Sequence, residues 1–190
     1  MMNARTTLLP LAFLILFALT PSASFASIQA RDHLTPQEVE LVKDAQVLDQ
    51  RIDIFVKAAE RRLLVLTGTT ATSSKQLKKD AEKWGELPTG TRAQLLADIA
   101  KILDEAITNI DDVSLRDEKN PQIPKALRKL AVEATRISEQ LKPMREQAKS
   151  DDEIASFASL TENAESILEA ASKLPPPTEK EKTKSKGEKK

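Results

Sequence analysis

The chain has 190 residues, with 29 basic and 29 acidic residues, 40% hydrophobic residues, 3% aromatic residues and no cysteine. The missing cysteine excludes disulfides and thiol nucleophiles, and the single histidine, His33, is too few for the di-iron sites that helical bundles build from several histidines. The balanced charge and the scarcity of aromatic rings argue against a nucleic-acid-binding domain, which needs a basic face or stacking side chains. We therefore expect no nucleic-acid partner, no metal and no cofactor.

Residues 1–26 have the three parts of a secretory signal peptide. Arg5 supplies the positive charge, an apolar run extends from Leu8 to Leu19, and small residues suited to cleavage follow. This run is shorter than the roughly 20 apolar residues that a membrane span needs. We predict that the signal is cleaved before Ser27 and that the mature chain is periplasmic or secreted, without stable membrane insertion; the alternative is an uncleaved anchor.

A leader at residues 27–34, expected to be flexible, precedes the first predicted helix. Thr35 and Glu38 fit a capping box, with a proline in the first turn between them. Apolar residues then recur at steps of three and four, which predicts one amphipathic helix of roughly 31 residues, ended by Gly68. This stripe comprises Leu41, Ala45, Leu48, Ile52, Phe55, Ala59, Leu63 and Leu66.

The connection at residues 67–90 holds the only tryptophan and two of the four glycines. Its first part, SSKQLKKDAEKWG, predicts a brief helix that ends at Gly85. We interpret the turn after it as a structural corner in which Trp84 plugs the end of the bundle; the alternative is a site for a ligand or a partner. The residues assigned to this corner or site are Trp84, Gly85, Leu87, Pro88 and Arg92.

The next predicted helix begins at Thr91, which fits a second capping box with Gln94. Leu95, Ile102 and other apolar residues flank its main stripe, so we expect this helix to be buried against two neighbours. The stripe comprises Leu96, Ile99, Leu103, Ala106, Ile110 and Val113.

After a break rich in proline, Pro124 lies in the first turn of a third predicted helix. Its stripe comprises Leu127, Leu130, Ala134, Ile137, Leu141, Met144 and Ala148. Pro143 lies inside this helix and should kink it, because its ring clashes with the carbonyl of Glu139 and it has no N–H to donate. We interpret the kink as a bend that fits the helix around its neighbours; the alternative is a hinge that opens a groove.

Ser150, Asp151 and Asp152 offer caps for a fourth predicted helix, which is rich in alanine and therefore expected to pack closely and to be the least stable of the four. Its stripe comprises Ile154, Phe157, Thr161, Ala164, Leu168 and Ala171. The tail at residues 175–190 carries six lysines against three glutamates. We expect it to be disordered and solubilising; the alternative is a weak electrostatic contact with acidic envelope surfaces.

Together these segments predict an all-α fold, an antiparallel four-helix bundle over residues 35–174, with a short extra helix in the first long connection and a disordered C-terminal tail. The spacing of the apolar residues also fits a long coiled-coil hairpin that dimerises, which is the alternative fold.

Two segments resemble known proteins. The run WGELP at residues 84–88, with Arg92 and Leu95 after it, resembles a segment of exported, helical bacterial proteins whose function is uncharacterised, which implies a helical fold. Residues 34–38, LTPQE, are similar to the Leu-Thr-x-x-Gln signature of the Spy/CpxP periplasmic stress chaperones, with Glu38 in place of the glutamine. This second resemblance implies a chaperone role.

From these observations we predict an exported, non-enzymatic interaction or scaffolding protein of the bacterial envelope with an unidentified protein partner. We expect no catalytic residue, because neighbouring acids such as Asp104 and Glu105 point in different directions on a helix surface. The alternative function is a periplasmic holdase that opens around Pro143. The residues it would offer to unfolded clients are Leu127, Leu130, Ile137 and Leu141.

Overall fold

The computed structural model describes residues 32–68 and 74–176, which lie in one unit, Arg31–Lys190. Within these ranges the chain is helical and has no strand, and none of its helices is long and apolar enough to cross a membrane. The predicted signal peptide, most of the predicted leader and nearly all of the lysine-rich tail lie outside the described residues. The helices are α1 (Pro36–Asp44), α2 (Leu48–Thr67), α3 (Ser74–Trp84), α4 (Arg92–Arg116), α5 (Gln122–Arg145) and α6 (Asp151–Ser172).

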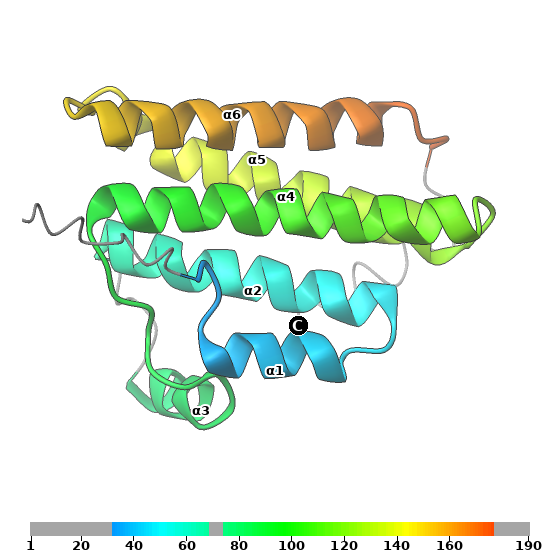
Figure 1. Cartoon of the computed structure of the whole chain (residues 1–190), viewed down its shortest axis with the longest axis horizontal. Helices are drawn as coiled ribbons and strands as arrows, with labels where there is room; N and C mark the ends of the chain where they lie inside the picture. Colours follow the sequence, from blue (N-terminus) through cyan, green and yellow to red (C-terminus); the bar gives the residue numbers. More distant parts are fainter. Residues whose placement is uncertain (1–31, 69–73, 177–190) are drawn as a thin grey trace, which may run out of the picture. The chain divides into compact units, whose positions relative to one another are not determined.

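Helices α2, α4, α5 and α6 form the predicted antiparallel four-helix bundle, and α1 lies alongside α2 (Figure 1). Around the bundle α2 contacts α4, α4 contacts α6, α6 contacts α5, and α5 contacts α2. The edge formed by α2 and α4 is therefore opposite the edge formed by α5 and α6. The short α3 occupies the first long connection, as predicted.

The core is built mainly from leucine, isoleucine and alanine side chains of the four bundle helices. The predicted wide apolar arc of α4 is confirmed, since Leu95 and Ile102 are buried together with its main stripe, of which only Val113 is partly exposed. This arc lets α4 contact α2, α5 and α6 at once. The largest fully buried apolar side chains are Phe55, Ile52, Leu96, Ile99, Ile102, Leu103, Ile110, Leu130, Ile137, Leu141 and Ile167.

The first predicted helix is wrong as a single element, because the structure divides it into α1 and α2. The backbone is extended at Ala45 and at Val47, and the chain reverses between them so that α1 folds back along α2 (Figure 1). Arg51 donates to the carbonyl of Ala45 through Nε and Nη2, at 3.2 and 2.9 Å, and Gln46 donates to the carbonyl of Lys43. These side chains satisfy carbonyl groups that a continuous helix would have bonded itself.

The predicted helix ends are confirmed where a side chain or a glycine determines them. Thr35 and Glu38 form a complete capping box at α1, and Thr91 and Gln94 form another at α4. Gly68 follows α2 with a φ of 62°, in the left-handed region that glycine adopts without strain. These local signals set the starts of α1 and α4 and the end of α2.

The predicted apolar stripe of α6 is wrong for two of its members. Ile154 is 53% exposed and Leu168 is 41% exposed, whereas Leu160 and Ile167 are buried against the bundle. Two sets of positions on a helix share Phe157, Ala164 and Ala171, and steps of three and four fit both of them. The packing of α6 against α4 and α5 selects the set that contains Leu160 and Ile167, which leaves apolar side chains on the surface.

Pro143 lies close to the end of α5, which stops at Arg145 and does not continue to Ala148 as predicted. Its side chain is exposed, and only two helical residues follow it. A bend at this position would redirect the connection between α5 and α6. The predictions of a kink and of a hinge at Pro143 remain predictions.

Candidate functional site

The predicted corner at residues 84–88 lies beside α2. Trp84 is 7% exposed, Pro88 is buried, and Leu87 remains on the surface. Gly85 has a φ of 70°, and the N–H of Gly85 donates to the carbonyl of Ala81, which closes the last turn of α3. The segment is therefore a folded turn that ends α3 and leads to α4.

Trp84 packs against charged side chains and does not belong to the apolar core cluster. The guanidinium carbon of Arg61 lies 6.0 Å from the centroid of the indole ring, and Nζ of Lys83 lies 5.6 Å from it. A cation above an indole face is attracted by the ring quadrupole. Trp84 thus holds the turn against Arg61 of α2, and the prediction that it plugs the end of the bundle needs this correction.

Arg92 is separate from this corner in its contacts, although the sequence grouped it with Trp84. Its Nη2 donates to the carbonyl of Met144 at 2.6 Å, and its Nε lies 3.5 Å from Oε1 of Glu153. Arg92 therefore connects the start of α4 to the end of α5 and the start of α6.

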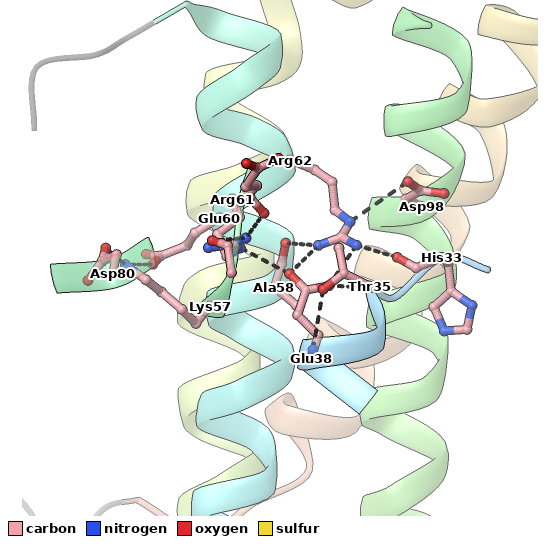
Figure 2. A network of polar contacts seen from close by, with 12 residues as sticks. His33, Thr35, Glu38, Lys57, Ala58, Glu60, Arg61, Arg62, Asp80 and Asp98 are labelled. Carbon is pink, nitrogen blue, oxygen red and sulfur yellow. Dashed lines mark hydrogen bonds and ion pairs between the residues drawn. The ribbon is translucent and has the colours of Figure 1, made fainter. Parts of the chain in front are cut away.

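A buried cluster of charged side chains joins α1, α2 and α4 (Figure 2). Glu38 of α1 is 0% exposed, and its Oε1 accepts from Nε of Arg61 at 3.0 Å and from Nη1 of Arg62 at 2.8 Å. Its Oε2 accepts from the backbone N–H of Thr35 at 2.9 Å and lies 2.8 Å from Nη2 of Arg62. One carboxylate thus caps α1 and binds two arginines of α2.

Arg62 uses its donors within the protein. Besides Glu38, its Nη1 donates to the carbonyl of Ala58 at 2.8 Å, and its Nη2 donates to the carbonyl of His33 at 2.6 Å. Its Nε makes no hydrogen bond but lies 3.8 Å from Oδ2 of the buried Asp98 of α4. The two arginines and the two acids balance in charge, so this cluster suits a structural junction better than a site that takes up a charged ligand.

Arg61 extends the cluster to the turn after α3. Its Nη2 donates to the carbonyl of Gly85 at 3.3 Å and to the carbonyl of Glu86. Burial lowers the pKa of Arg61, and the neighbouring carboxylate of Glu38 opposes this shift. Since an arginine in a protein remains protonated, Arg61 acts as a permanent cation that ties α1, α2 and the turn together.

A cavity of about 530 Å³ lies next to this cluster, between the chain that enters α1 and the turn before α4. Its walls contain both apolar and polar side chains. The one arginine among its lining residues, Arg62, already donates to Glu38. Among the described residues no group of three or more acids or histidines is placed to hold a metal ion. The cavity is lined by Asp32, Leu34, Thr35, Pro36, Val39, Glu40, Arg62, Pro88 and Thr89.

The predicted leader contributes to this region where it is described. Leu34 is buried in the core cluster, and Nε2 of His33 lies 2.6 Å from Oε2 of Glu105 on α4. His33 and Leu34 are therefore packed against α2 and α4, in contrast to the flexible leader that we expected.

Sequence reasoning found Glu38 as a capping residue but missed its pairing with Arg61 and Arg62. A signal for Arg62 exists, because it follows Phe55 by seven residues and Ala59 by three, which places it on the buried face of α2. A charged residue on such a face requires a buried partner. The identity of that partner depends on the reversal between α1 and α2.

A second cavity, of about 310 Å³, forms a groove between α5 and α6 on the opposite edge of the bundle; we call it the α5–α6 groove. Its buried apolar residues are Leu141, Phe157, Leu160 and Ala164, and the exposed Leu168 lies on its α6 wall. Neither Trp84 nor Pro143 lines it. Its lining residues are Ser138, Glu139, Leu141, Lys142, Arg145, Phe157, Leu160, Thr161, Ala164, Glu165 and Leu168.

The two sides of this groove differ in charge. Between Asp151 and Ser172, α6 has six acidic residues and no lysine or arginine, and Glu165 faces the groove. The end of α5 contributes two cations, Lys142 and Arg145, and one acid, Glu139. Within the described part of the chain, the side chains of Glu165, Lys142 and Arg145 make no ion pair.

Comparison with known proteins found no match to a family model, to a curated protein or to a solved structure. The resemblances to exported helical proteins and to Spy/CpxP chaperones therefore remain expectations from the sequence.

Proposed function

We propose that the chain is an exported, non-enzymatic interaction or scaffolding protein of the bacterial envelope, and that it binds a protein partner through the edge formed by α5 and α6. The signal-like segment at residues 1–26 supports export. The α5–α6 groove supports partner binding at this edge, because it joins buried apolar residues to the exposed Leu168.

The exposed side of α6 is the observation that carries this proposal. Ile154 and Leu168 are large apolar residues on the surface of a helix that buries Leu160 and Ile167 at intervening positions. Single exposed apolar residues are common, but here one of them is continuous with a groove that has an apolar floor. The buried charged cluster on the other edge supports the non-enzymatic part of the proposal, because its members bind one another.

A holdase is less well supported than an interaction module. Leu127, Leu130, Ile137 and Leu141, which a holdase would offer to clients, all lie in the bundle core. Their exposure would require α5 to separate from its neighbours, and only two helical residues of α5 follow Pro143. If the purified chain delayed the aggregation of an unfolded test protein, the holdase would become the better supported function.

Site-specific crosslinking in the producing cell tests the partner-binding edge. A photoreactive amino acid at position 168 should give a defined adduct with another protein, whereas the same amino acid at position 115 should not. Leu115 is the matched control because it is a leucine that is 87% exposed and lies on α4, away from the α5–α6 groove. Equal adducts at both positions, or none at position 168, would contradict the proposal.

Export is tested separately by mass spectrometry of the chain isolated from the producing cell. The proposal expects a mature N-terminus at Ser27 and recovery in the periplasm or the medium. Recovery of the intact chain from the cytoplasm would remove the envelope part of the proposal while leaving partner binding open to the crosslinking test.

The lysine-rich tail has a smaller part in this proposal, a weak contact with acidic envelope surfaces. Residues 175–190 contain six lysines and three glutamates, so such a contact should weaken as salt increases. Removing these residues should reduce envelope association at low salt. Unchanged association would assign the tail a solubilising role only.

A further inference from the structure

We propose that the α5–α6 groove binds one amphipathic helix of a partner protein, and that this helix carries basic residues on the flank that faces α6. This inference rests on the proposed function and specifies the chemistry of the partner.

The exposed apolar residues of α6 extend over a distance that one partner helix could cover. Ile154, Thr161 and Leu168 follow one another at intervals of seven residues, so they lie along one side of α6. Ile154 and Leu168 are about 21 Å apart along the axis, since a helix rises 1.5 Å per residue. A partner helix of about four turns would cover this distance.

The walls of the groove favour a helix over an extended peptide. Both walls are α-helices, whose backbone N–H and C=O groups are already bonded within each helix. An extended peptide needs backbone partners such as a sheet edge, and no strand exists in the described ranges. A helix satisfies its own backbone and needs only to place its apolar side chains in the groove.

The opposite edge of the same molecule provides an example of this arrangement. There α1, an amphipathic helix of nine residues, packs against α2, with Val39 and Val42 against the core. A short helix of this chain thus covers one edge of the bundle, and the α5–α6 edge has no such cover in the described residues.

Charge complementarity selects the flank of the partner helix. Glu153 is near Arg92, and Glu169 pairs with Lys173, but Glu162 and Glu165 form no ion pair with any described residue. Both are exposed; Glu165 lies one turn of α6 before Leu168, and Glu162 lies one turn before Glu165. Lysine or arginine on the adjacent flank of the partner would meet these acids, whereas an acidic flank would be repelled.

Three synthetic peptides of 18 residues serve as probes. The first is an amphipathic helix with leucine on one face, lysine on one flank and glutamine at its other polar positions. The second is the same helix with glutamate in place of lysine, and the third has the composition of the first with its leucines spread around the helix. Binding to the full chain is measured by fluorescence anisotropy. We expect the first peptide to bind at least tenfold more tightly than either of the others, and more weakly at high salt.

Matched variants locate the bound peptide. Leu168→Ser should weaken binding of the first peptide at least fivefold, and Leu115→Ser should leave it unchanged. The double variant Glu162→Gln/Glu165→Gln should reduce the preference for lysine over glutamate and the dependence on salt. This double variant changes only exposed side chains, so it tests the proposal even if Leu168→Ser alters the fold.

Several results would overturn the proposal. Equal binding of the three peptides, or equal effects of Leu168→Ser and Leu115→Ser, would remove the groove as the binding site. A dimer of the chain that Leu168→Ser dissociates would assign the groove to a second copy, and tighter peptide binding after removal of residues 177–190 would assign it to the tail. A specific crosslink from position 168 without any preference for the basic peptide would leave the proposed function intact and reject only this partner chemistry.

Discussion

The bundle has two edges that differ in how they are covered: the edge beside α1 and the edge between α5 and α6. At the first edge a helix of the chain itself covers α2, and Glu38, Arg61 and Arg62 are buried as mutual partners. At the second edge the groove stays open, with Leu168 exposed and acidic side chains around it. Buried charges that are fully paired specify how one chain folds, whereas exposed apolar residues beside unpaired charges are suited to a second molecule.

The largest effect should come from breaking the buried cluster. Glu38→Ala should lower the free energy of unfolding by about 3–5 kcal/mol, because it leaves two buried arginines without their shared carboxylate and removes a helix cap. Urea unfolding followed by circular dichroism measures this change. Glu40→Ala is the matched control on the same helix, since the exposed pair of Glu40 with Lys43 should contribute at most about 1 kcal/mol.

Equal effects of Glu38→Ala and Glu40→Ala would contradict the structural role that we assign to the buried cluster beside α1. The cluster would then behave as a surface pair, and the fold-back of α1 would not depend on it.

Two neighbouring residues of α6 test which face of this helix is buried and which is exposed at the α5–α6 edge. Ile167→Ala should cost about 2–5 kcal/mol, because it leaves a cavity in the core. Leu168→Ala, one residue away, should cost less than about 1 kcal/mol, because that side chain is partly in water already. Thermal or urea unfolding of the two variants compares them directly, and a larger loss from Leu168→Ala would place the wrong face of α6 in the core.

The sequence was sufficient for features that depend on local chemistry. The two capping boxes and the glycine ends of α2 and α3 follow from residues within one or two helical turns. The all-helical fold and the four-helix bundle follow from apolar residues at helical spacing. The caps and the glycine ends form between neighbours in the chain, and the apolar spacing is a pattern within each helix, so each has a signal in the sequence.

Features that depend on competition between distant surfaces had no such signal. The stripe from Leu41 to Ile52 keeps its spacing across the reversal at Ala45, so periodicity could not reveal the break between α1 and α2. The two apolar sets of α6 share three residues, and only packing against α4 and α5 separates Ile167 from Leu168. The pairing of Glu38 with Arg62 required that break to be known first.

A smaller effect is expected at the turn that completes the α1 edge. Gly85→Ala should lower the free energy of unfolding by about 1–2 kcal/mol, because alanine is strained at a φ of 70°. Crowding adds little, since a Cβ on residue 85 would lie 3.6 Å from Cβ of Gln37, an ordinary contact. The fluorescence of Trp84, the only tryptophan, should report a displaced turn by shifting to longer wavelength.

Gly68→Ala serves as the control, because this glycine has a similar φ of 62° and lies at the end of α2. It should cost a similar free energy but leave the emission of Trp84 unchanged. A shift of the tryptophan emission in both variants would mean that the turn is not anchored locally by Arg61.

The smallest effect concerns an ion cluster between α2 and α5 that is only partly buried, unlike the one at Glu38. Burial alone would raise the pKa of Asp49, but hydrogen bonds and charges from Lys125 and Lys129 outweigh it and lower that pKa below 3.8. A carboxylate whose pKa is lowered by folding stabilises the folded state above its unfolded pKa, and this contribution is lost as the pH falls through the folded value. Asp49→Asn should therefore cost about 0.2–1 kcal/mol at neutral pH, and the difference from the parent chain should shrink as acid protonates Asp49. Urea unfolding of both chains between neutral and acid pH measures this difference.

A difference that persisted unchanged at low pH would mean that Asp49 acts through packing and not through its charge. The two ion clusters would then differ in kind as well as in burial.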